Sequence, residues 1–370
     1  MKRSFNGIYN NLNVLVTGHT GFKGSWLSIW LKEMGAQVTG LSLDPPTNPN
    51  LFDCAQVSET LKDIRSDIRD LNSVVQVFQE TQPEIVFHLA AQPIVLNSYE
   101  DPVETFHVNS QGTVNVLEAA RLSDSVKAVI VITTDKCYEN HEWIWGYREN
   151  DELGGHDPYS CSKAMAELAA QAYRHSYSMK IATARAGNVI GGGDFAQFRI
   201  IPDTMGALME GEPVEVRRPD SVRPWLHVLD PLNGYLMLGQ KMLEQEDAFA
   251  GAWNFGPMEH QAIPVRSIVE QAISLWGQGE WKNVGSKDLK PEKEMLRLNW
   301  DKAANKLDWQ PKYDWKKGIS ETVDWFKVYS NQKNNSGIYS LTVQQIQRFI
   351  NTRTATDEIS THPPARVLSN

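Results

Sequence analysis

A short apolar segment that enters a glycine-rich turn and then a helix constrains this chain more than any other feature. Residues 12–17 (LNVLVT) predict a strand, residues 21–34 predict a helix, and the loop Gly18-His19-Thr20-Gly21-Phe22-Lys23-Gly24 joins them. Glycines at this spacing allow a tight turn, close approach of the backbone to a pyrophosphate, and close packing of the helix on the sheet. We therefore predict a dinucleotide site formed by Gly18, Thr20, Gly21, Phe22, Lys23 and Gly24. A glycine turn that only reverses the chain is the alternative.

Strands and helices continue to alternate through the first half of the chain. Further strands are predicted over 37–43, 61–64, 84–89, 126–133 and 181–185, and further helices over 71–82, 102–122 and 158–177. Strands that are almost wholly apolar and alternate with helices are typical of a parallel sheet covered on both faces. The prediction is an α/β fold: a Rossmann-type doubly wound sheet with a smaller, mixed α/β C-terminal substrate domain.

The pattern changes after Ala186, where GNVIGGGD and turns containing proline begin. We assign residues 1–186 to the nucleotide-binding domain, with 226–250 returning to it, and residues 187–225 and 251–330 to the substrate domain. Residues 331–370 are predicted to be a linker, a helix near 341–353 and a mobile tail.

Three further segments extend the predicted cofactor site. Asp44 follows the second strand, roughly twenty residues after Gly24, where a carboxylate accepts hydrogen bonds from ribose hydroxyls and repels a 2′-phosphate. This favours NAD over NADP. Asp67-Ile68 and Leu89-Ala90-Ala91 fall at the carboxyl ends of later strands, the edge at which open α/β sheets bind ligands. Helix-to-sheet packing explains the two alanines equally well.

Tyr159 and Lys163 lie four residues apart at the start of a predicted helix, and therefore on one face of it. A nearby ammonium stabilises a phenolate, so we expect a lowered pKa for Tyr159, which would take a proton from a substrate hydroxyl during hydride transfer. Thr134, at the end of strand 126–133, is expected to hydrogen-bond that hydroxyl. Asp135 and Lys136 add an acid and a base that a simple alcohol oxidation does not require. An ordinary solvated surface pair explains Asp135 and Lys136 equally well.

Composition narrows the partners. The chain has 36 basic and 45 acidic residues and a net charge of −9, the wrong sign for a protein whose whole surface binds nucleic acid. Phosphate must therefore be held locally, and the candidates for a substrate diphosphate are Arg199, Arg217, Arg218 and Arg223. We expect at least one of Arg217 and Arg218 to be simply solvated. The mean hydropathy of −0.41 argues against a membrane partner.

The histidines and cysteines predict neither a metal site nor disulfides. The three cysteines are scattered, no CxxC spacing occurs, and none of the nine histidines lies in an HxH or HExxH motif. The N-terminal residues lack the apolar region of a signal peptide, so the predicted compartment is the cytoplasm.

Together these motifs resemble the extended short-chain dehydrogenase/reductase family and, within it, the nucleotide-sugar 4,6-dehydratases. The resemblance covers roughly residues 11–327, and its most specific stretches are GHTGFKGSWL, HLAAQP, TTDKCYEN, YSCSK, ARAGNVIGGGD and RPWLHVLD. It implies that bound NAD oxidises the sugar at C4 with Tyr159 as base, that water leaves across C5 and C6, and that the hydride returns to C6. It also implies that Asn188 and Arg223 contact the substrate's pyrophosphate, and that helices 102–122 and 158–177 form a homodimer or dimer of dimers.

The chain departs from the pattern of many of these dehydratases at one position. They carry an Asp-Glu pair, in which the aspartic acid protonates the leaving C6 hydroxyl and the glutamate removes the C5 proton, whereas this chain has Asp135-Lys136. A lysine acts as a base only if desolvation or nearby positive charge lowers its pKa. Lysine here is similar to the branch that acts on CDP-glucose, which implies that substrate and a role in deoxysugar biosynthesis of the lipopolysaccharide type.

Two other functions stay open. A nucleotide-sugar 4-epimerase would share the fold, NAD, Tyr159 and Lys163, but it needs no acid/base pair at 135 and 136. A non-catalytic NAD-sensing scaffold would keep the glycine loop without needing Tyr159 and Lys163.

Overall fold

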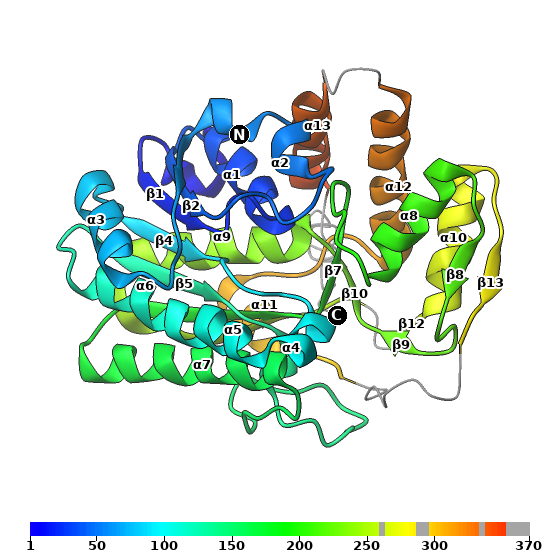
Figure 1. The fold of residues 1–370 in the computed structure, drawn as a ribbon. Helices are drawn as coiled ribbons and strands as arrows, with labels where there is room; N and C mark the ends of the chain where they lie inside the picture. Colours follow the sequence, from blue (N-terminus) through cyan, green and yellow to red (C-terminus); the bar gives the residue numbers. More distant parts are fainter. Residues whose placement is uncertain (259–262, 286–295, 333–336, 353–370) are drawn as a thin grey trace, which may run out of the picture.

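A parallel sheet of seven strands forms the centre of the computed structural model, which describes residues 1–258, 263–285, 296–332 and 337–352 (Figure 1). The strand order is β11-β6-β5-β4-β1-β2-β3, and all neighbours are parallel. The order reverses between β1 and β4, the topological position at which such sheets bind ligands. The strands are β1 (Asn13–Thr17), β2 (Gln37–Ser42), β3 (Lys62–Arg65), β4 (Ile85–His88), β5 (Ala128–Ile132), β6 (Ile181–Ala186) and β11 (Gly251–Phe255).

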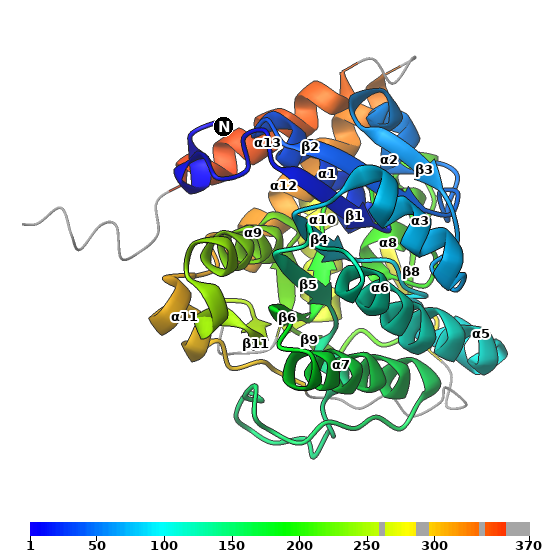
Figure 2. The ribbon, with the colours of Figure 1, turned by 90° about the vertical axis from the view of Figure 1, so that its left-hand side faces the viewer.

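Helices cover both faces of this sheet (Figure 2). Alternate residues of the strands pack into two separate cores: Val14, Phe87 and Ile130 belong to the larger one, and Leu15 and Val86 to the smaller one. The larger core contains α1 (Phe22–Glu33) and α9 (Leu229–Glu244), while the smaller contains α3 (Leu71–Thr81), α6 (Gly112–Arg121) and α7 (Pro158–Ser176). Period-two burial on two faces confirms the predicted Rossmann-type sheet.

The predicted strands and helices of the first half are all present, with small shifts at their ends. The helix predicted over 102–122 consists of α5 (Pro102–Phe106), a π-helical turn (His107–Gln111) and α6. Two short helices were not predicted, α2 (Leu51–Cys54) and α4 (Val95–Glu100).

The position of strand β11 differs from the domain division predicted from the sequence, which placed residues 251–330 in the substrate domain. It pairs with β6 along its whole length and completes the large sheet. Its buried Asn254 donates from Nδ2 to the carbonyl oxygens of Tyr147 (2.8 Å) and Asn299 (3.0 Å). Asn254 interrupts the apolar run by which the other strands were recognised. Its burial is possible because these tertiary contacts satisfy the polar side chain.

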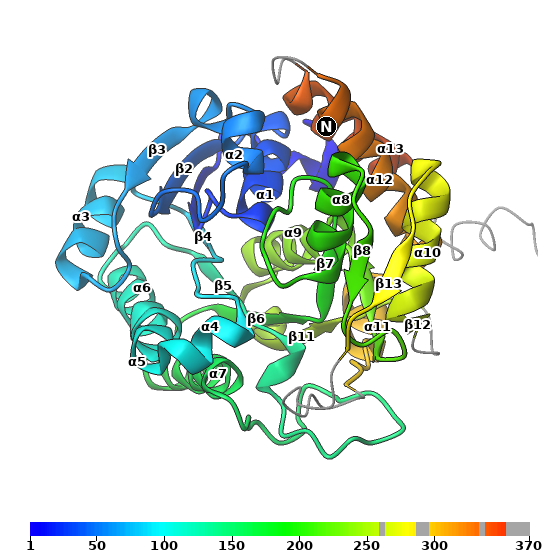
Figure 3. The same cartoon turned by 45° about the vertical axis from the view of Figure 1, so that its right-hand side comes forward.

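A smaller unit packs beside the sheet (Figure 3). It has three short strand pairs, β7 with β10, β9 with β12, and β8 with β13, and a group of helices. These elements are β7 (Asn188–Ile190), α8 (Ile200–Glu210), β8 (Val214–Val216), β9 (Val222–Arg223), β10 (Trp225–His227), β12 (Ile263–Pro264), α10 (Val265–Trp276), β13 (Trp281–Asn283) and α12 (Trp315–Asn331). A further short helix, α11 (Asp301–Leu307), lies against β11.

The C-terminal helix, predicted near 341–353, is α13 (Ile338–Asn351), and it packs on α1 of its own chain. The Phe349 ring lies edge-on to the Trp30 ring at 5.9 Å, and the Tyr339 hydroxyl donates to Glu33 at 2.9 Å. Lys312 Nζ donates to three carbonyl oxygens at the end of the helix, among them Thr352 at 3.0 Å. Most of the predicted linker and the predicted mobile tail lie outside the described residues.

Candidate active site

The glycine loop has two positions, Gly18 and Gly24, at which the fold leaves no room for a side chain. Gly18 has a φ of +74°, and a Cβ there would lie 2.6 Å from the amide nitrogen of Ala90. A Cβ on Gly24 would lie 2.1 Å from the Gly18 carbonyl oxygen. The loop therefore brings bare backbone to the N-terminus of α1, between β1 and β4. These residues fit the pyrophosphate of a dinucleotide.

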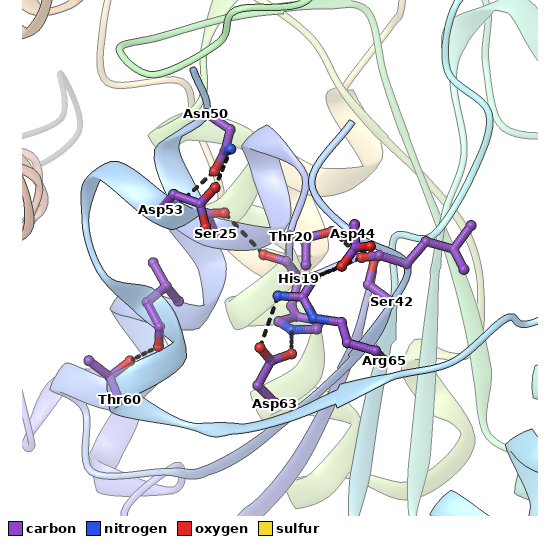
Figure 4. A network of polar contacts seen from close by, with 12 residues as sticks. His19, Thr20, Ser25, Ser42, Asp44, Asn50, Asp53, Thr60, Asp63 and Arg65 are labelled. Atoms are coloured by element: carbon purple, nitrogen blue, oxygen red, sulfur yellow. Dashed lines mark hydrogen bonds and ion pairs between the residues drawn. The ribbon is translucent and has the colours of Figure 1, made fainter. Parts of the chain in front are cut away.

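Polar side chains at the ends of β1, β2 and β3 form a network beside the loop (Figure 4). The Thr20 hydroxyl contacts Ser42 Oγ at 2.8 Å and donates to the Leu43 carbonyl at 3.1 Å, so it ties the loop to β2. The Asp44 side chain is 92% exposed, as a ribose-binding carboxylate must be, and Arg65 Nη1 lies 3.7 Å from it. Arg65 was not predicted from the sequence, because nothing in the segment KDIR signals the direction of its side chain.

The segments after β3 and β4 lie on either side of the loop's strand. The Asp67 carboxylate accepts from Arg69 Nε at 2.8 Å, which lowers the pKa of Asp67, while Ile68 is buried. The amides of Leu89 and Ala90 donate to the backbone and side chain of Thr17 at 3.1 and 3.2 Å. Both segments are thus held at the carboxyl edge of the sheet, and Ala91 follows directly. Their contact with a cofactor stays a prediction.

Tyr159 and Lys163 project from the first turns of α7, which Asp157 caps by accepting from the Ser160 amide at 2.9 Å. The Thr134 side chain acts on the Tyr159 hydroxyl, and Lys163 Nζ donates to the Ile132 carbonyl at 3.2 Å. All three residues are buried. The structure therefore brings the predicted Tyr, Lys and Thr together at the end of β5.

The expected lowering of the Tyr159 pKa is wrong for this structure. Burial raises the pKa of Tyr159 to about 12 and outweighs the opposing effect of the nearby Thr134 side chain. Burial also lowers the pKa of Lys163 to about 8. Desolvation disfavours the charged form of both groups, and this effect depends on depth in the fold, which the i,i+4 spacing does not reveal.

Asp135 and Lys136 lie in a single 3₁₀ turn directly after β5. Thr134 Oγ1 accepts from the Lys136 amide at 3.3 Å and donates to Asp135 Oδ1 at 2.9 Å. Burial raises the pKa of Asp135, against the opposing charges of Lys136 and Arg223. A buried carboxyl with a raised pKa is suited to donate a proton, and this burial is inconsistent with a solvated surface pair.

The residues predicted to bind substrate divide into two groups. Arg223 acts electrostatically on Asp135, and Arg199 on Tyr159, so both lie near the predicted catalytic residues. Asn188 begins β7, and a Cβ on the preceding Gly187 would lie 3.0 Å from Asp135 Oδ2. Arg217 instead lies 4.0 Å from Asp203 of α8.

A buried ion pair between Arg185 and Glu167, behind the 3₁₀ turn of Asp135 and Lys136, was not predicted from the sequence. Arg185 of β6 donates from Nε and Nη2 to the two oxygens of Glu167 at 2.9 and 2.8 Å. Thr133 and Thr183 also donate to Glu167, and Arg185 donates to the Tyr138 hydroxyl at 2.6 Å. Glu167 lies one turn after Lys163, so the ion pair links α7, β6 and Tyr138 at the end of the 3₁₀ turn. The only sequence signal for Glu167 was its spacing of four residues from Lys163.

Neither a metal-binding cluster nor a membrane-spanning helix is found among the described residues. Over these ranges no group of three or more His, Cys, Asp or Glu side chains could hold a metal ion. No described helix is both long enough and apolar enough to cross a bilayer.

The sheet, the glycine loop and the Tyr-Lys pair together define a Rossmann-type enzyme with the residues of the short-chain dehydrogenase/reductase type. The model of a family described as GDP-mannose 4,6 dehydratase matches residues 15–322, and the chain belongs to that family.

Individual relatives and solved structures agree with this assignment. The chain is 45% identical over 325 residues to a CDP-glucose 4,6-dehydratase of Salmonella typhimurium, with 85% of this chain and 90% of the relative covered. It is 27% identical to a dTDP-glucose 4,6-dehydratase of Xanthomonas campestris, with 84% and 92% covered. Among structures, UDP-glucose 4-epimerase of Thermus thermophilus in complex with NAD has a TM-score of 0.73 at 28% identity, covering 85% of this chain and 98% of that one.

Proposed function

We propose that this enzyme converts CDP-glucose to CDP-4-keto-6-deoxyglucose and water. The observation that carries the proposal is the buried Asp135, which shares one turn with Lys136, accepts a hydrogen bond from Thr134 and lies near Tyr159. An acid and a base in addition to the oxidation residues support an elimination, which an epimerase does not perform. The 45% identity to a CDP-glucose 4,6-dehydratase supports the nucleotide.

Each catalytic residue has a separate task in this proposal. Bound NAD supplies the acceptor and donor of the hydride. Tyr159 takes the proton of the C4 hydroxyl, which Thr134 orients, and Lys163 provides positive charge beside it. The C5 proton becomes acidic next to the 4-keto group, and Lys136 removes it. Asp135 protonates the leaving C6 hydroxyl, a task that its raised pKa supports.

The binding residues fall into one group for the cofactor and one for the nucleotide sugar. We assign the cofactor to the backbone of the glycine loop with Asp44, Asp67, Ile68, Leu89, Ala90 and Ala91, and the nucleotide sugar to Asn188, Arg199, Arg217 and Arg223. The location of Arg199 and Arg223 near catalytic residues supports these two more strongly than Arg217. A cytoplasmic location is proposed because both the cofactor and the nucleotide sugar are cytoplasmic metabolites.

A homodimer is the proposed assembly. Helices α4, α5 and α7 expose large apolar side chains, including Val103 (64% exposed), Leu168 (53%) and Met165 (44%). Apolar residues gathered on neighbouring helices favour pairing with the same face of a second copy. Sedimentation should find a dimer for the wild type and a monomer for Leu168→Glu. A Leu168→Glu variant that stays dimeric would exclude this face.

The direct test is turnover of CDP-glucose compared with dTDP-, UDP- and GDP-glucose, read from the alkaline absorbance of the 4-keto sugar. Preferred turnover of CDP-glucose is the expected result. An epimerised hexose without the chromophore would indicate the epimerase, and activity that persists in Tyr159→Phe would exclude the proposed chemistry.

The base is tested separately with Lys136→Ala. This variant should bind NAD normally but lose exchange of the C5 proton with deuterated solvent. Lys127→Ala is a matched control, because Lys127 lies at the opposite end of β5 and pairs with Glu84 on the surface. Exchange at the wild-type rate in Lys136→Ala would remove Lys136 from the mechanism.

A further inference from the structure

Lys23 belongs to the glycine loop by sequence, but its side chain lies within electrostatic reach of Lys163 and Asp135, two of the proposed catalytic residues. It lies in the first turn of α1 and is partly buried. The charged groups that act on it are Lys163, Arg199, Asp135 and Asp194, which come from α7, the end of β5 and the connection from β7 to α8. Lys163 and Asp135 are proposed catalytic residues, and Asp194 and Arg199 lie in the smaller unit.

Two contacts hold the first turn of α1 against the connection after β7. The Phe22 ring lies 3.1 Å from the position that a Cβ on Gly191 would take, and Trp26 Nε1 donates to the Gly192 carbonyl at 2.9 Å. Phe22 and Trp26 are on either side of Lys23 in the sequence. The Lys23 side chain is therefore carried to the turn that leads to Asp194.

The same turn holds an arginine in place. The buried Asp194 accepts from Arg199 Nη1 at 3.1 Å and from the Ala196 amide at 3.1 Å. Arg199 remains 36% exposed at its side chain, so part of its guanidinium is accessible to a ligand. Lys23 and Arg199 thus approach one region from the cofactor loop and from the start of α8.

The Lys23 ammonium has cations near it but no hydrogen-bonded acceptor within the part of the chain that is described. Burial first, then Lys163 and Arg199, lower its pKa to about 7, and Asp135 and Asp194 offset this only in part. A desolvated ammonium without an acceptor is costly unless an anion binds to it.

We propose that Lys23, together with Arg199, binds the diphosphate of the sugar-nucleotide substrate. This inference rests on the proposed function. Backbone amides at the start of α1 already fit the cofactor's own diphosphate, whereas Asp194 and Arg199 lie in the smaller unit that closes over the substrate. A compact ammonium beside a guanidinium fork suits phosphate oxygens.

Three variants test the assignment. Lys23→Met keeps the length of the side chain without its charge, Lys23→Arg restores the charge, and Lys32→Met is a control at an exposed position in the last turn of the same helix. The measurements are the KM for CDP-glucose, the dissociation constant of inorganic diphosphate by calorimetry, and the dissociation constant of NAD.

In Lys23→Met the KM for CDP-glucose and the dissociation constant of diphosphate should each rise about tenfold or more, as expected for a lost charge-assisted hydrogen bond. The dissociation constant of NAD for Lys23→Met should stay within about threefold of the wild-type value. Lys23→Arg should recover most of the affinity, and Lys32→Met should match the wild type.

Unchanged KM and diphosphate affinity in Lys23→Met would overturn the proposal. An equal rise in the NAD dissociation constant would also overturn it, because it would assign Lys23 to the cofactor's diphosphate. Diphosphate binding requires no turnover, so this measurement tests Lys23 even if CDP-glucose proves not to be the substrate.

Discussion

Replacement of Glu167 by glutamine should strongly destabilise the protein, although the two side chains have nearly the same shape. Glu167 is 4% exposed and accepts hydrogen bonds from Arg185, Thr133 and Thr183. Glutamine keeps the volume but leaves the Arg185 guanidinium, which is 2% exposed, without a counter-charge. Loss of one partner of a buried ion pair costs about 3–5 kcal/mol. That is a large share of the roughly 5–15 kcal/mol by which proteins are stable.

The assay is urea denaturation followed by tryptophan fluorescence. Glu118→Gln is the matched control, because Glu118 makes the same type of pair with Arg121 at the surface, where the loss of stability should be much smaller. The double variant Glu167→Gln/Arg185→Gln removes both charges and should lose less than the sum of its single variants. A loss below about 1 kcal/mol for Glu167→Gln would refute the reasoning that the buried charge dominates.

The same pair predicts how stability depends on pH. Burial raises the pKa of Glu167, but the ion pair with Arg185 and the hydrogen bonds outweigh burial, and the net pKa is lowered. A carboxyl with a lowered folded pKa stabilises the protein above its unfolded pKa of about 4.3. This contribution disappears as the pH falls through the folded pKa. The difference between wild type and Glu167→Gln should therefore narrow below about pH 4.

Three other changes test the site. Gly24→Ala should abolish retention of NAD, measured as cofactor released on denaturation, because its Cβ would lie 2.1 Å from the Gly18 carbonyl oxygen; normal retention would show that the loop can shift. Asp44→Ser should improve NADP binding relative to NAD by about tenfold or more, because it removes the carboxylate that repels a 2′-phosphate and lies 3.7 Å from Arg65; an unchanged ratio of dissociation constants would exclude Asp44 from cofactor selection. Asp135→Asn should reduce kcat by about 10²–10⁴ with little change in KM, because the amide lacks the acidic proton; a near-normal kcat would assign the acid elsewhere.

The order of strands and helices in the first half could be predicted from the sequence because its signals are local. Apolar runs, helical spacing and the glycine loop each depend on residues within one or two turns of each other, and the structure confirms them. The grouping of Thr134, Asp135, Tyr159 and Lys163 could be predicted for a related reason, since parallel strands bring the ends of successive segments to one edge.

The place of strand β11 in the sheet and the docking of helix α13 could not be assigned in this way. β11 contains Asn254, whose amide is satisfied by Tyr147 and Asn299, and these partners are distant in the sequence. The docking of α13 depends on Trp30, Glu33 and Lys312, which lie on other elements. Local patterns contain no information on such partners.

The charge states of the site were decided by tertiary structure. The sequence by itself determined that a phenol and an ammonium share one face of α7, but the burial of Tyr159 raises its pKa, opposite to the expectation from spacing. The charge environment of Lys23, set by Asp194 and Arg199 among others, and the pairing of Glu167 with Arg185 likewise depend on packing between distant segments. Residue identity determines which chemistry is available, whereas desolvation and neighbouring charges, which exist only in the folded chain, determine which form each group adopts.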